Sequence, residues 1–331
     1  MKCTNNLLYK KFICGIMISL MVFTLPSCGN SSYELPFEGN SKVSGFNIIT
    51  EQKSDVIPLF ASDLCISDKQ VTDPDFANTE DCGTAILFDV MNSEVLYSSH
   101  AHEQMSPASL TKVLMALVAL KNATPDTVLT ASEQIFINEQ GAQLCGLKPG
   151  DTMTLNQALY IALLHSANDA ALLIAQNIGG SEEGFVEMMN QEAQRLGATN
   201  SNFVNPHGLT DSNQYTTAYD LYLIFNEAIK YEKFVEIIQT PTYETIYYDR
   251  NGKEVPISVR NTNKYINSDV KAPENVKIIG GKTGTTNAAG HCLMVLAKDK
   301  NGAPYISVIL KAGSRDSLYA QMTDLLEEIT K

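Results

Sequence analysis

The sequence predicts one α/β domain whose sheet combines strands from both ends of the folded part of the chain. Short β-type runs occur within residues 84–97 and return within residues 276–310. Between them, from Ser106 to Leu196, apolar residues recur at helical spacing. Strands at both ends with helices between them are typical of an α/β domain. The length of 331 residues, 44% of them apolar, is enough for one large domain or two modest ones.

The first strands form a predicted hairpin, in which the β-type runs Thr84–Val90 and Glu94–Tyr97 flank a short turn. Ser106 and Pro107 then mark a helix start, because a capping hydroxyl followed by proline at the first helical position is a common N-terminal pattern. This helix is expected to run to about Leu120.

Further helices and strands follow along the chain. The next predicted helices are Leu155–Leu164, Asn168–Ile178 and Glu182–Leu196, and glycines directly follow the last two. After residue 240 the pattern changes to short β runs, which are Val276–Ile279, Cys292–Ala297 and Ile306–Leu310. An amphipathic helix from Arg315 to Ile329 closes the chain.

The first residues have the pattern of a bacterial export signal. Three lysines give the segment a positive start, and the apolar run Phe12–Leu25 has 14 residues, fewer than the roughly 20 of a membrane span. The run ends in Leu25-Pro-Ser-Cys28, which resembles a lipobox, where the cysteine thiol carries a lipid. We therefore expect residues 1–27 to be a lipoprotein signal peptide, with an ordinary secretory signal as the alternative.

Behind this signal we expect lipidation of Cys28, a flexible tether over residues 28–58 and one folded domain over residues 59–331. The tether is rich in Ser, Asn and Gly, and such a linker reaches roughly 30 Å. The predicted location is extracytoplasmic and membrane-anchored through the N-terminal lipid, or secreted if the signal is an ordinary one.

Charge and cysteine content exclude some classes of site. The chain has 24 basic and 37 acidic residues, a formal charge of −13, which argues against nucleic acid as a partner because phosphates need a basic face. No C-x-x-C or H-E-x-x-H pattern occurs, so no metal site or cofactor is expected. Disulfides are allowed outside the cytoplasm. Cys65 and Cys82 flank a polar loop and are the expected pair, with two free buried thiols as the alternative.

The helix after Ser106 carries the first chemical pattern, Ser109 with Lys112. The run from Leu110 to Leu120 is apolar on almost every face, so a helix here is buried all round. Burial lowers the pKa of Lys112, and a lysine with a lowered pKa can act as a general base at neutral pH. Ser109 lies three residues earlier on the same face, in the first turn, where backbone N–H groups favour negative charge. The pair predicts a serine nucleophile activated by lysine.

A second match to the same S-x-x-K spacing lies at Ser268 and Lys271. About one such match is expected by chance in a chain of this length. This one falls in a polar loop with no buried helix, so Ser109 and Lys112 are the preferred pair.

Two other short patterns add polar side chains to the predicted site. Ser166-Ala-Asn168 lies at a break between two helices, where polar groups can project into a cleft; taken alone, it could equally be a helix cap. Lys282-Thr-Gly284 ends a β run after two glycines, which let a substrate backbone approach a strand closely; taken alone, it could be an exposed strand end.

In the order S-x-x-K, S-x-N and K-T-G, these patterns match the penicillin-recognising serine enzymes. Their flanking segments (Pro107–Lys112, Asn205–Leu209 followed by Tyr215–Asp220, and Gly281–Thr285) closely resemble the serine-type D-alanyl-D-alanine carboxypeptidases, the low-molecular-mass penicillin-binding proteins. The resemblance runs from about residue 60 to residue 331. It implies a β-lactamase/transpeptidase-like α/β sandwich, with an antiparallel sheet flanked by helices plus an all-helical subdomain.

The resemblance also implies a reaction. Ser109 would attack the carbonyl between the last two D-alanines of a peptidoglycan stem peptide, Lys112 would take its proton, and Ser166 would relay a proton towards the leaving amine. Water would then hydrolyse the acyl-enzyme, and β-lactams would be covalent inhibitors. The backbone N–H groups of Ser109 and Thr285 are implied to form the oxyanion hole.

The implied substrate-binding residues approach the terminal carboxylate or the peptide amide, and they are Asn168, Lys282, Thr283, Gly284 and Thr285. Asn168 would also position Lys112. Arg315 is a further candidate for the carboxylate pocket, set against a plain charge at a helix start.

Ser106 and His207 lie near the proposed nucleophile or its flanking patterns. A Ser106 cap would compete with the oxyanion for the N–H of Ser109, so we expect this cap to be weak or turned elsewhere. His207 is expected to have a structural role, because no G-x-S-x-G elbow surrounds a serine here.

Three alternative functions stay open. A β-lactamase shares the three patterns, but the E-x-x-L-N string that its common class uses for deacylation is absent between Asn168 and Lys282. A D,D-endopeptidase is a near relative, and a non-catalytic penicillin-binding wall protein is the alternative from another class. Because 47 residues follow Gly284, no C-terminal β domain is expected, and anchoring falls to the N-terminus.

Overall fold

The computed structural model describes residues 64–67, 69–72 and 82–331. The predicted signal peptide, the lipid site Cys28 and the tether over residues 28–58 lie outside the described residues. Among the residues that are described, no helix has both the length and the apolar character needed to cross a bilayer.

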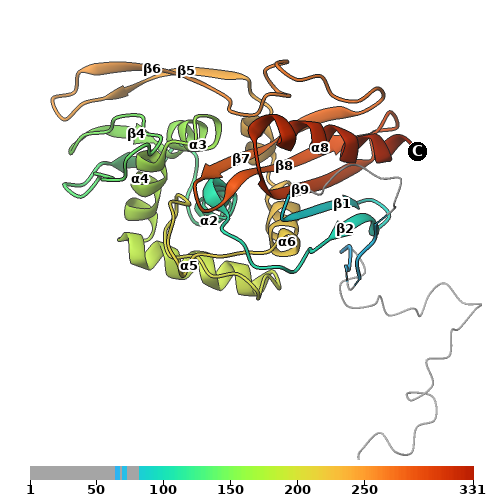
Figure 1. Cartoon of the computed structure of the whole chain (residues 1–331). Coiled ribbons are helices and arrows are strands. Elements are labelled where there is room, and N and C mark those ends of the chain that lie inside the picture. Colours follow the sequence, from blue (N-terminus) through green and yellow to red (C-terminus); the bar gives the residue numbers. More distant parts are fainter. Residues whose placement is uncertain (1–63, 68, 73–81) are drawn as a thin grey trace, which may run out of the picture. The chain divides into compact units, whose positions relative to one another are not determined.

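The main sheet joins the two ends of the folded chain, as the sequence predicts. Within the described residues, five strands pair antiparallel in the order β2-β1-β9-β8-β7 (Figure 1). Their bounds are β1 Thr84–Asp89, β2 Glu94–Ser99, β7 Lys277–Thr286, β8 Gly290–Lys298 and β9 Pro304–Ala312. The K-T-G pattern lies within β7 at the edge of this sheet, so one side of its backbone is left unpaired.

Alternate side chains of the main sheet enter two separate hydrophobic cores. On β1, Ala85 and Leu87 belong to the core that includes the C-terminal helix α8, Arg315–Glu327. Ile86 and Phe88 belong to the core on the opposite face, with the other helices. The sheet is therefore covered on both faces, and Figure 1 shows α8 lying across one of them.

The helical layer surrounds α2, Thr111–Asn122. Residues 111–119 of this helix are all buried, which confirms the prediction of a helix buried on every side. The helices around it are α3 Leu155–Leu164, α4 Asn168–Ile178, α5 Glu182–Arg195 and α6 Ala218–Ala228. A capping box starts α3, because Thr154 accepts from the N–H of Gln157 and its own N–H donates back to that side chain.

A second sheet and two helices were not among the predicted elements. Among the described strands, four pair in the order β3-β4-β5-β6. Their bounds are β3 Val128–Thr130, β4 Thr152–Thr154, β5 Thr242–Tyr248 and β6 Glu254–Arg260. The unpredicted helices are α6, which is rich in aromatic residues that favour strands, and α7, Glu232–Ile238, which has only seven residues.

The helix predicted from Ser106 begins differently. A 3₁₀ turn, η1, spans Ala108–Leu110 and precedes α2, because Ala108 has a positive φ of 46° that a regular helix does not allow. Pro107 is the N-cap, and no side chain caps the turn. The expectation that Ser106 does not cap this turn is therefore confirmed.

The expected disulfide between Cys65 and Cys82 is not formed in this structure. Cys65 is a buried thiol whose Sγ donates to the carbonyl of Asp89 at 3.3 Å, and burial raises its pKa to about 11. Its backbone N–H donates to the hydroxyl of Tyr222, and Tyr219 donates to its carbonyl. These bonds fix Cys65 against α6 as a packed thiol. The alternative of two buried thiols is therefore met by Cys65, whereas Cys82 is only partly buried.

Candidate active site

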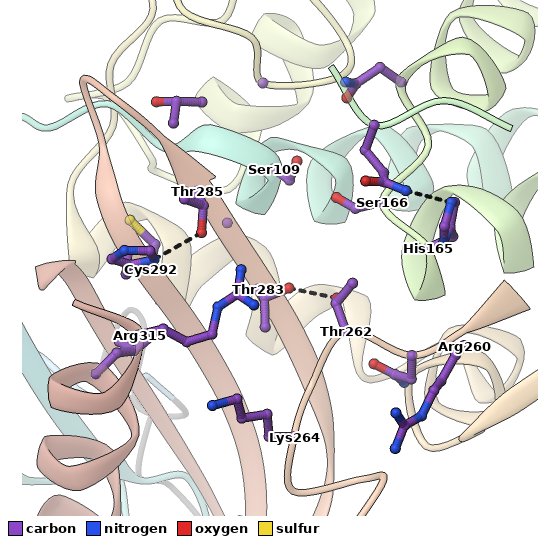
Figure 2. A pocket seen from close by; sticks show the side chains of 18 of the residues that line it. Ser109, His165, Ser166, Arg260, Thr262, Lys264, Thr283, Thr285, Cys292 and Arg315 are labelled. Atoms are coloured by element: carbon purple, nitrogen blue, oxygen red, sulfur yellow. Dashed lines mark hydrogen bonds between the residues drawn. The ribbon is translucent and has the colours of Figure 1, made fainter. Parts of the chain in front are cut away.

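Ser109 lies in the 3₁₀ turn at the N-terminal end of the buried helix α2. The turn is held by Leu110 N–H on Pro107 O at 3.2 Å and by the Thr111 hydroxyl on Ala108 O at 2.8 Å. Ser109 is only partly buried and lines a pocket of about 480 Å³ (Figure 2). A serine in this place is accessible to a ligand although the helix behind it is not.

Lys112 is fully buried directly beneath Ser109. Its Nζ lies 3.0 Å from Ser109 Oγ, 2.6 Å from Asn168 Oδ1 and 2.5 Å from the His207 carbonyl oxygen. Burial and then the positive charge of Lys282 lower the pKa of Lys112 well below its usual 10.5, against an opposing effect of Asp169. The two amide oxygens can only accept, so a neutral Lys112 donates to both and presents its lone pair to the Ser109 hydroxyl.

Ser166 occupies the turn between α3 and α4 in a left-handed conformation, with φ of 64°. Such a conformation is uncommon for a non-glycine residue and often marks a functional site. The turn places Ser166 on the pocket wall and starts α4 with Asn168. The S-x-N pattern thereby brings both side chains to the lysines, since Lys282 Nζ lies 3.0 Å from Ser166 Oγ.

Lys282 is the second buried lysine of the site. It projects from β7, is 1% exposed, and donates to the carbonyl of Thr283 at 2.9 Å as well as to Ser166. Burial lowers its pKa to about 7. Near neutral pH it therefore titrates, and an anion bound beside it would stabilise its charged form.

Gly284 allows β7 to lie against the turn that carries the nucleophile. A Cβ at this position would come within 3.0 Å of Ala108 Cβ and 3.1 Å of Ser109 N. Gly208 makes a closer approach from the other side, where a Cβ would lie 1.9 Å from Ala108 O. The turn that carries Ser109 thus packs closely between two glycines, and a side chain at either position would displace it.

Thr283, Thr285 and Arg315 line the same pocket as Ser109. Figure 2 shows Arg315 reaching from α8 towards Thr283. Two other cations of the rim are paired, Arg260 with Asp269 at 2.9 Å and Lys264 with Asp316 at 3.4 Å. Among the ion pairs of the described residues, Arg315 takes part in none, so its charge is available to a ligand.

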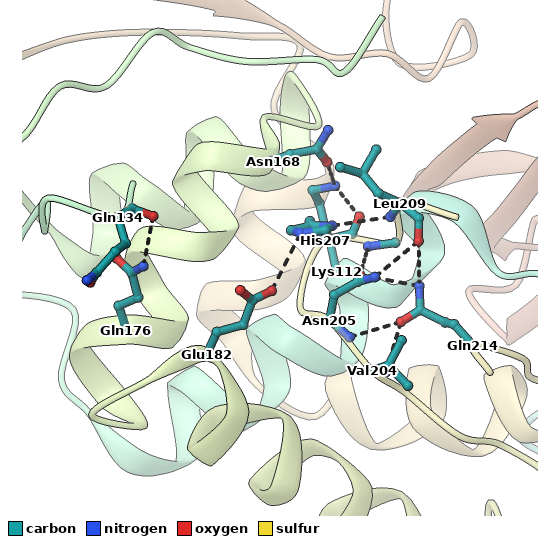
Figure 3. A network of polar contacts seen from close by, with 11 residues as sticks. Lys112, Gln134, Asn168, Gln176, Glu182, Val204, Asn205, His207, Leu209 and Gln214 are labelled. Atoms are coloured by element: carbon teal, nitrogen blue, oxygen red, sulfur yellow. Dashed lines mark hydrogen bonds and ion pairs between the residues drawn. The ribbon is translucent and has the colours of Figure 1, made fainter. Parts of the chain in front are cut away.

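His207 lies behind Lys112 and supports it through the main chain. Burial lowers the pKa of His207 to about 3, and its Nδ1 accepts from Leu209 N–H at 3.2 Å, so the imidazole is neutral. Its Nε2 lies 3.6 Å from the Glu182 carboxylate, and because the ring is neutral this contact is not an ion pair at neutral pH (Figure 3). The loop is also held by Asn205 and Gln214. Lys112 contacts the backbone carbonyl of His207 and not its side chain, so no side-chain pattern in the sequence could predict the contact.

Asp169 is a site-supporting residue that the sequence patterns missed. Its carboxylate accepts four backbone N–H groups, which belong to Cys145, Gly146, Leu147 and Ala170 at 2.8–3.1 Å. It is 3% exposed. The cradle fixes the loop before α3 to the first turn of α4, next to Asn168, and only the adjacency of an acid to the S-x-N pattern could have hinted at it.

The competing pair Ser268 and Lys271 is exposed and lies outside any helix or strand. Neither residue lines the pocket. In the part of the chain that the structure describes, no group of three His, Cys, Asp or Glu side chains could hold a metal ion. The pocket instead brings together Ser109, Ser166, Asn168, Thr283, Gly284, Thr285 and Arg315, with Lys112 and Lys282 bonded to its wall.

Comparison with known proteins gives consistent matches. A family model described as D-alanyl-D-alanine carboxypeptidase matches residues 69–314. A Bacillus subtilis D-alanyl-D-alanine carboxypeptidase, DacF, is 34% identical over 248 residues, 74% of this chain and 61% of that protein. A Pseudomonas aeruginosa D-alanyl-D-alanine endopeptidase is 32% identical over 73% of this chain and 75% of its own length.

A solved structure shares the fold. The chain matches the crystal structure of a Streptomyces DD-transpeptidase with a TM-score of 0.70 at 26% identity, over 78% of this chain and 98% of that one. The predicted sandwich with a helical part is therefore confirmed. The chain spans about three fifths of the length of the Bacillus subtilis relative and of an Escherichia coli carboxypeptidase, DacC.

Proposed function

This chain belongs to the D-alanyl-D-alanine carboxypeptidase family of serine peptidases, and on that premise we propose that it removes the terminal D-alanine from peptidoglycan stem peptides. The observation that carries the proposal is the contact between buried Lys112 and Ser109 at 3.0 Å, with Lys282 and Ser166 forming a second pair at the same distance. One pair serves the nucleophile and the other serves the leaving group.

In the proposed acylation, neutral Lys112 takes the proton of Ser109 as Oγ attacks the carbonyl between the two D-alanines. The charge that develops on the carbonyl oxygen is stabilised by the backbone N–H groups of Ser109 and Thr285. As the peptide bond breaks, Ser166 gives its proton to the leaving amine and regains one from charged Lys282, 3.0 Å away. Water then hydrolyses the ester on Ser109: the proton of the water returns through Ser166 to Lys282, and Lys112 returns its proton to Oγ of Ser109.

Recognition of the terminal carboxylate falls to the β7 side of the pocket. Lys282 and Arg315 supply positive charge, and Thr283 and Thr285 supply hydroxyl donors beside it. A carboxylate bound here forms charge-assisted bonds with buried Lys282 at low local dielectric, while Arg315 adds its charge from the exposed rim. A β-lactam, which presents a carboxylate beside a reactive amide, is the expected covalent inhibitor.

The test is a comparison of two activities of the purified wild-type chain. An N-acylated D-Ala-D-Ala peptide is expected to yield free D-alanine, measured by a coupled oxidase assay, while a chromogenic cephalosporin acylates the enzyme and turns over slowly. Rapid cephalosporin turnover without D-alanine release would identify a β-lactamase instead. Penicillin labelling with neither activity would identify a non-catalytic wall protein.

An endopeptidase activity is a second candidate, because the match to the Pseudomonas aeruginosa endopeptidase covers 75% of that relative's length. A cross-linked muropeptide dimer offered beside the free D-Ala-D-Ala peptide distinguishes the two. Cleavage of the dimer at a higher kcat/KM than the free peptide would make endopeptidase the main activity.

We also propose that the protein is a lipoprotein on the outer side of the bacterial cytoplasmic membrane. The support is the lysine-rich start, the 14-residue apolar run and the lipobox-like Leu25–Cys28 of the sequence. Metabolic labelling with a palmitate analogue is expected to tag the wild type and not Cys28→Ala. A tag that persists in Cys28→Ala would exclude this cysteine as the lipid site.

A further inference from the structure

We propose that His291 is a positioning residue that orients the hydroxyl of Thr285 towards the terminal carboxylate of the substrate. The inference rests on the proposed D,D-carboxypeptidase function and adds a residue that determines which leaving group the site accepts. His291 lies outside the three sequence patterns and makes no contact with Ser109 or Lys112 among the described hydrogen bonds.

The two residues face each other across neighbouring strands. Thr285 on β7 is directly opposite His291 on β8 in the antiparallel register, and Thr285 Oγ1 lies 3.2 Å from His291 Nδ1. Both residues line the pocket that contains Ser109. Figure 2 shows Thr283 and Thr285 on the same wall of the pocket, facing Arg315, with a dashed line for the bond that Thr285 makes.

A threonine hydroxyl has one proton and rotates freely, so its partner decides where that proton points. If Nδ1 of His291 carries a hydrogen, the ring donates to Oγ1 and the Thr285 proton is left for the carboxylate. If Nδ1 is bare, the hydroxyl donates to the ring and is lost to the substrate. A bound carboxylate can only accept, so it favours the first arrangement, in which His291 and Thr285 donate in series.

The neighbouring threonine shows the contrast. Thr283 Oγ1 lies 2.6 Å from the hydroxyl of Thr262, and either oxygen can be the donor. That pair of hydroxyls imposes no direction, whereas an imidazole that holds its hydrogen on Nδ1 does. Burial and then the positive charge of Arg315 lower the pKa of His291, so a neutral ring with one hydrogen is the relevant form at neutral pH.

The experiment compares two substrates that differ only at the terminal group: an N-acylated D-Ala-D-Ala peptide and its C-terminal carboxamide. His291→Leu is expected to lower kcat/KM for the carboxylate peptide about tenfold and for the carboxamide less than about twofold. His291→Asn, whose amide reaches the position of Nδ1, is expected to recover most of the loss. In a Thr285→Val background, His291→Leu is expected to have no further effect, because the bond it supports is already gone.

Each other result overturns the proposal. Equal losses on the two substrates, with an unchanged melting temperature, would show that His291 acts on the nucleophile or on packing. Full activity in His291→Leu, or an undiminished loss in the Thr285→Val background, would show that the bond does not orient Thr285. A wild-type protein that cleaves neither substrate would instead refute the carboxypeptidase function itself, and the role of His291 falls with it.

Discussion

Ser109→Ala is expected to abolish the acyl-enzyme and to reduce D-alanine release by about 10⁴- to 10⁶-fold. The reason is that Oγ of Ser109 is the hydroxyl that lies 3.0 Å from Nζ of the buried base Lys112. Without it, binding and the oxyanion donors can polarise the peptide, but no covalent intermediate forms. Labelling with a fluorescent penicillin, followed on a denaturing gel, measures the first effect directly.

The chain supplies a matched control for this variant. Ser268→Ala removes the serine of the second S-x-x-K match, which is exposed and outside the pocket. This variant is expected to be labelled by the fluorescent penicillin and to release D-alanine at the wild-type rate. Labelling that survives in Ser109→Ala, or that disappears in Ser268→Ala, would show that Ser109 is not the nucleophile.

Lys112→Met is expected to lower the rate of acylation by about 10³- to 10⁴-fold while Ser109 remains in place. Methionine has nearly the length of lysine and suits the fully buried position, so the change removes the base with little change in volume. Stopped-flow measurement of penicillin acylation isolates this step from deacylation and product release.

Two readouts separate a base from a simple positive charge at this position. Lys112→Arg supplies a permanent positive charge but cannot accept a proton, because guanidinium stays protonated, so it is expected to be as slow as Lys112→Met. In the wild type, acylation is expected to slow as the pH falls through the lowered pKa of Lys112, since the ammonium has no lone pair for the Ser109 proton. A rapid Lys112→Arg variant would contradict the role of base.

The sequence could predict the parts of the fold that depend on local apolar patterns. The run from Leu110 to Leu120 has apolar side chains on almost every face, and the helix there is indeed buried all round. The strands near Thr84 and Ile306 could be assigned for the same reason, because strands covered on both faces are continuously apolar. Their pairing across more than 200 residues followed from the order of elements along the chain.

Elements fixed by tertiary contacts could not be predicted. The three-residue strands β3 and β4 have no period to detect, and β5 and β6 expose one face along most of their length. The left-handed Ala108 and Ser166 are held by their surroundings, since neither residue favours that conformation by itself. The same holds for the His207 carbonyl, because any residue type would supply the oxygen that Lys112 contacts.

Two lysines buried side by side also set how the folding equilibrium responds to protons. In the unfolded chain Lys282 titrates near 10.5, whereas in the folded protein its pKa is about 7. Between these values the unfolded state binds more protons, so the free energy of unfolding rises with pH across this window and reaches its full value only above it. Below the window Lys282 is charged in both states, and the folded protein carries the cost of a buried cation whose charge also lowers the pKa of Lys112. The folded state is thus least stable at the pH values at which its pocket attracts an anion most strongly. A carboxylate bound beside Lys282 offsets that cost and so stabilises the folded protein.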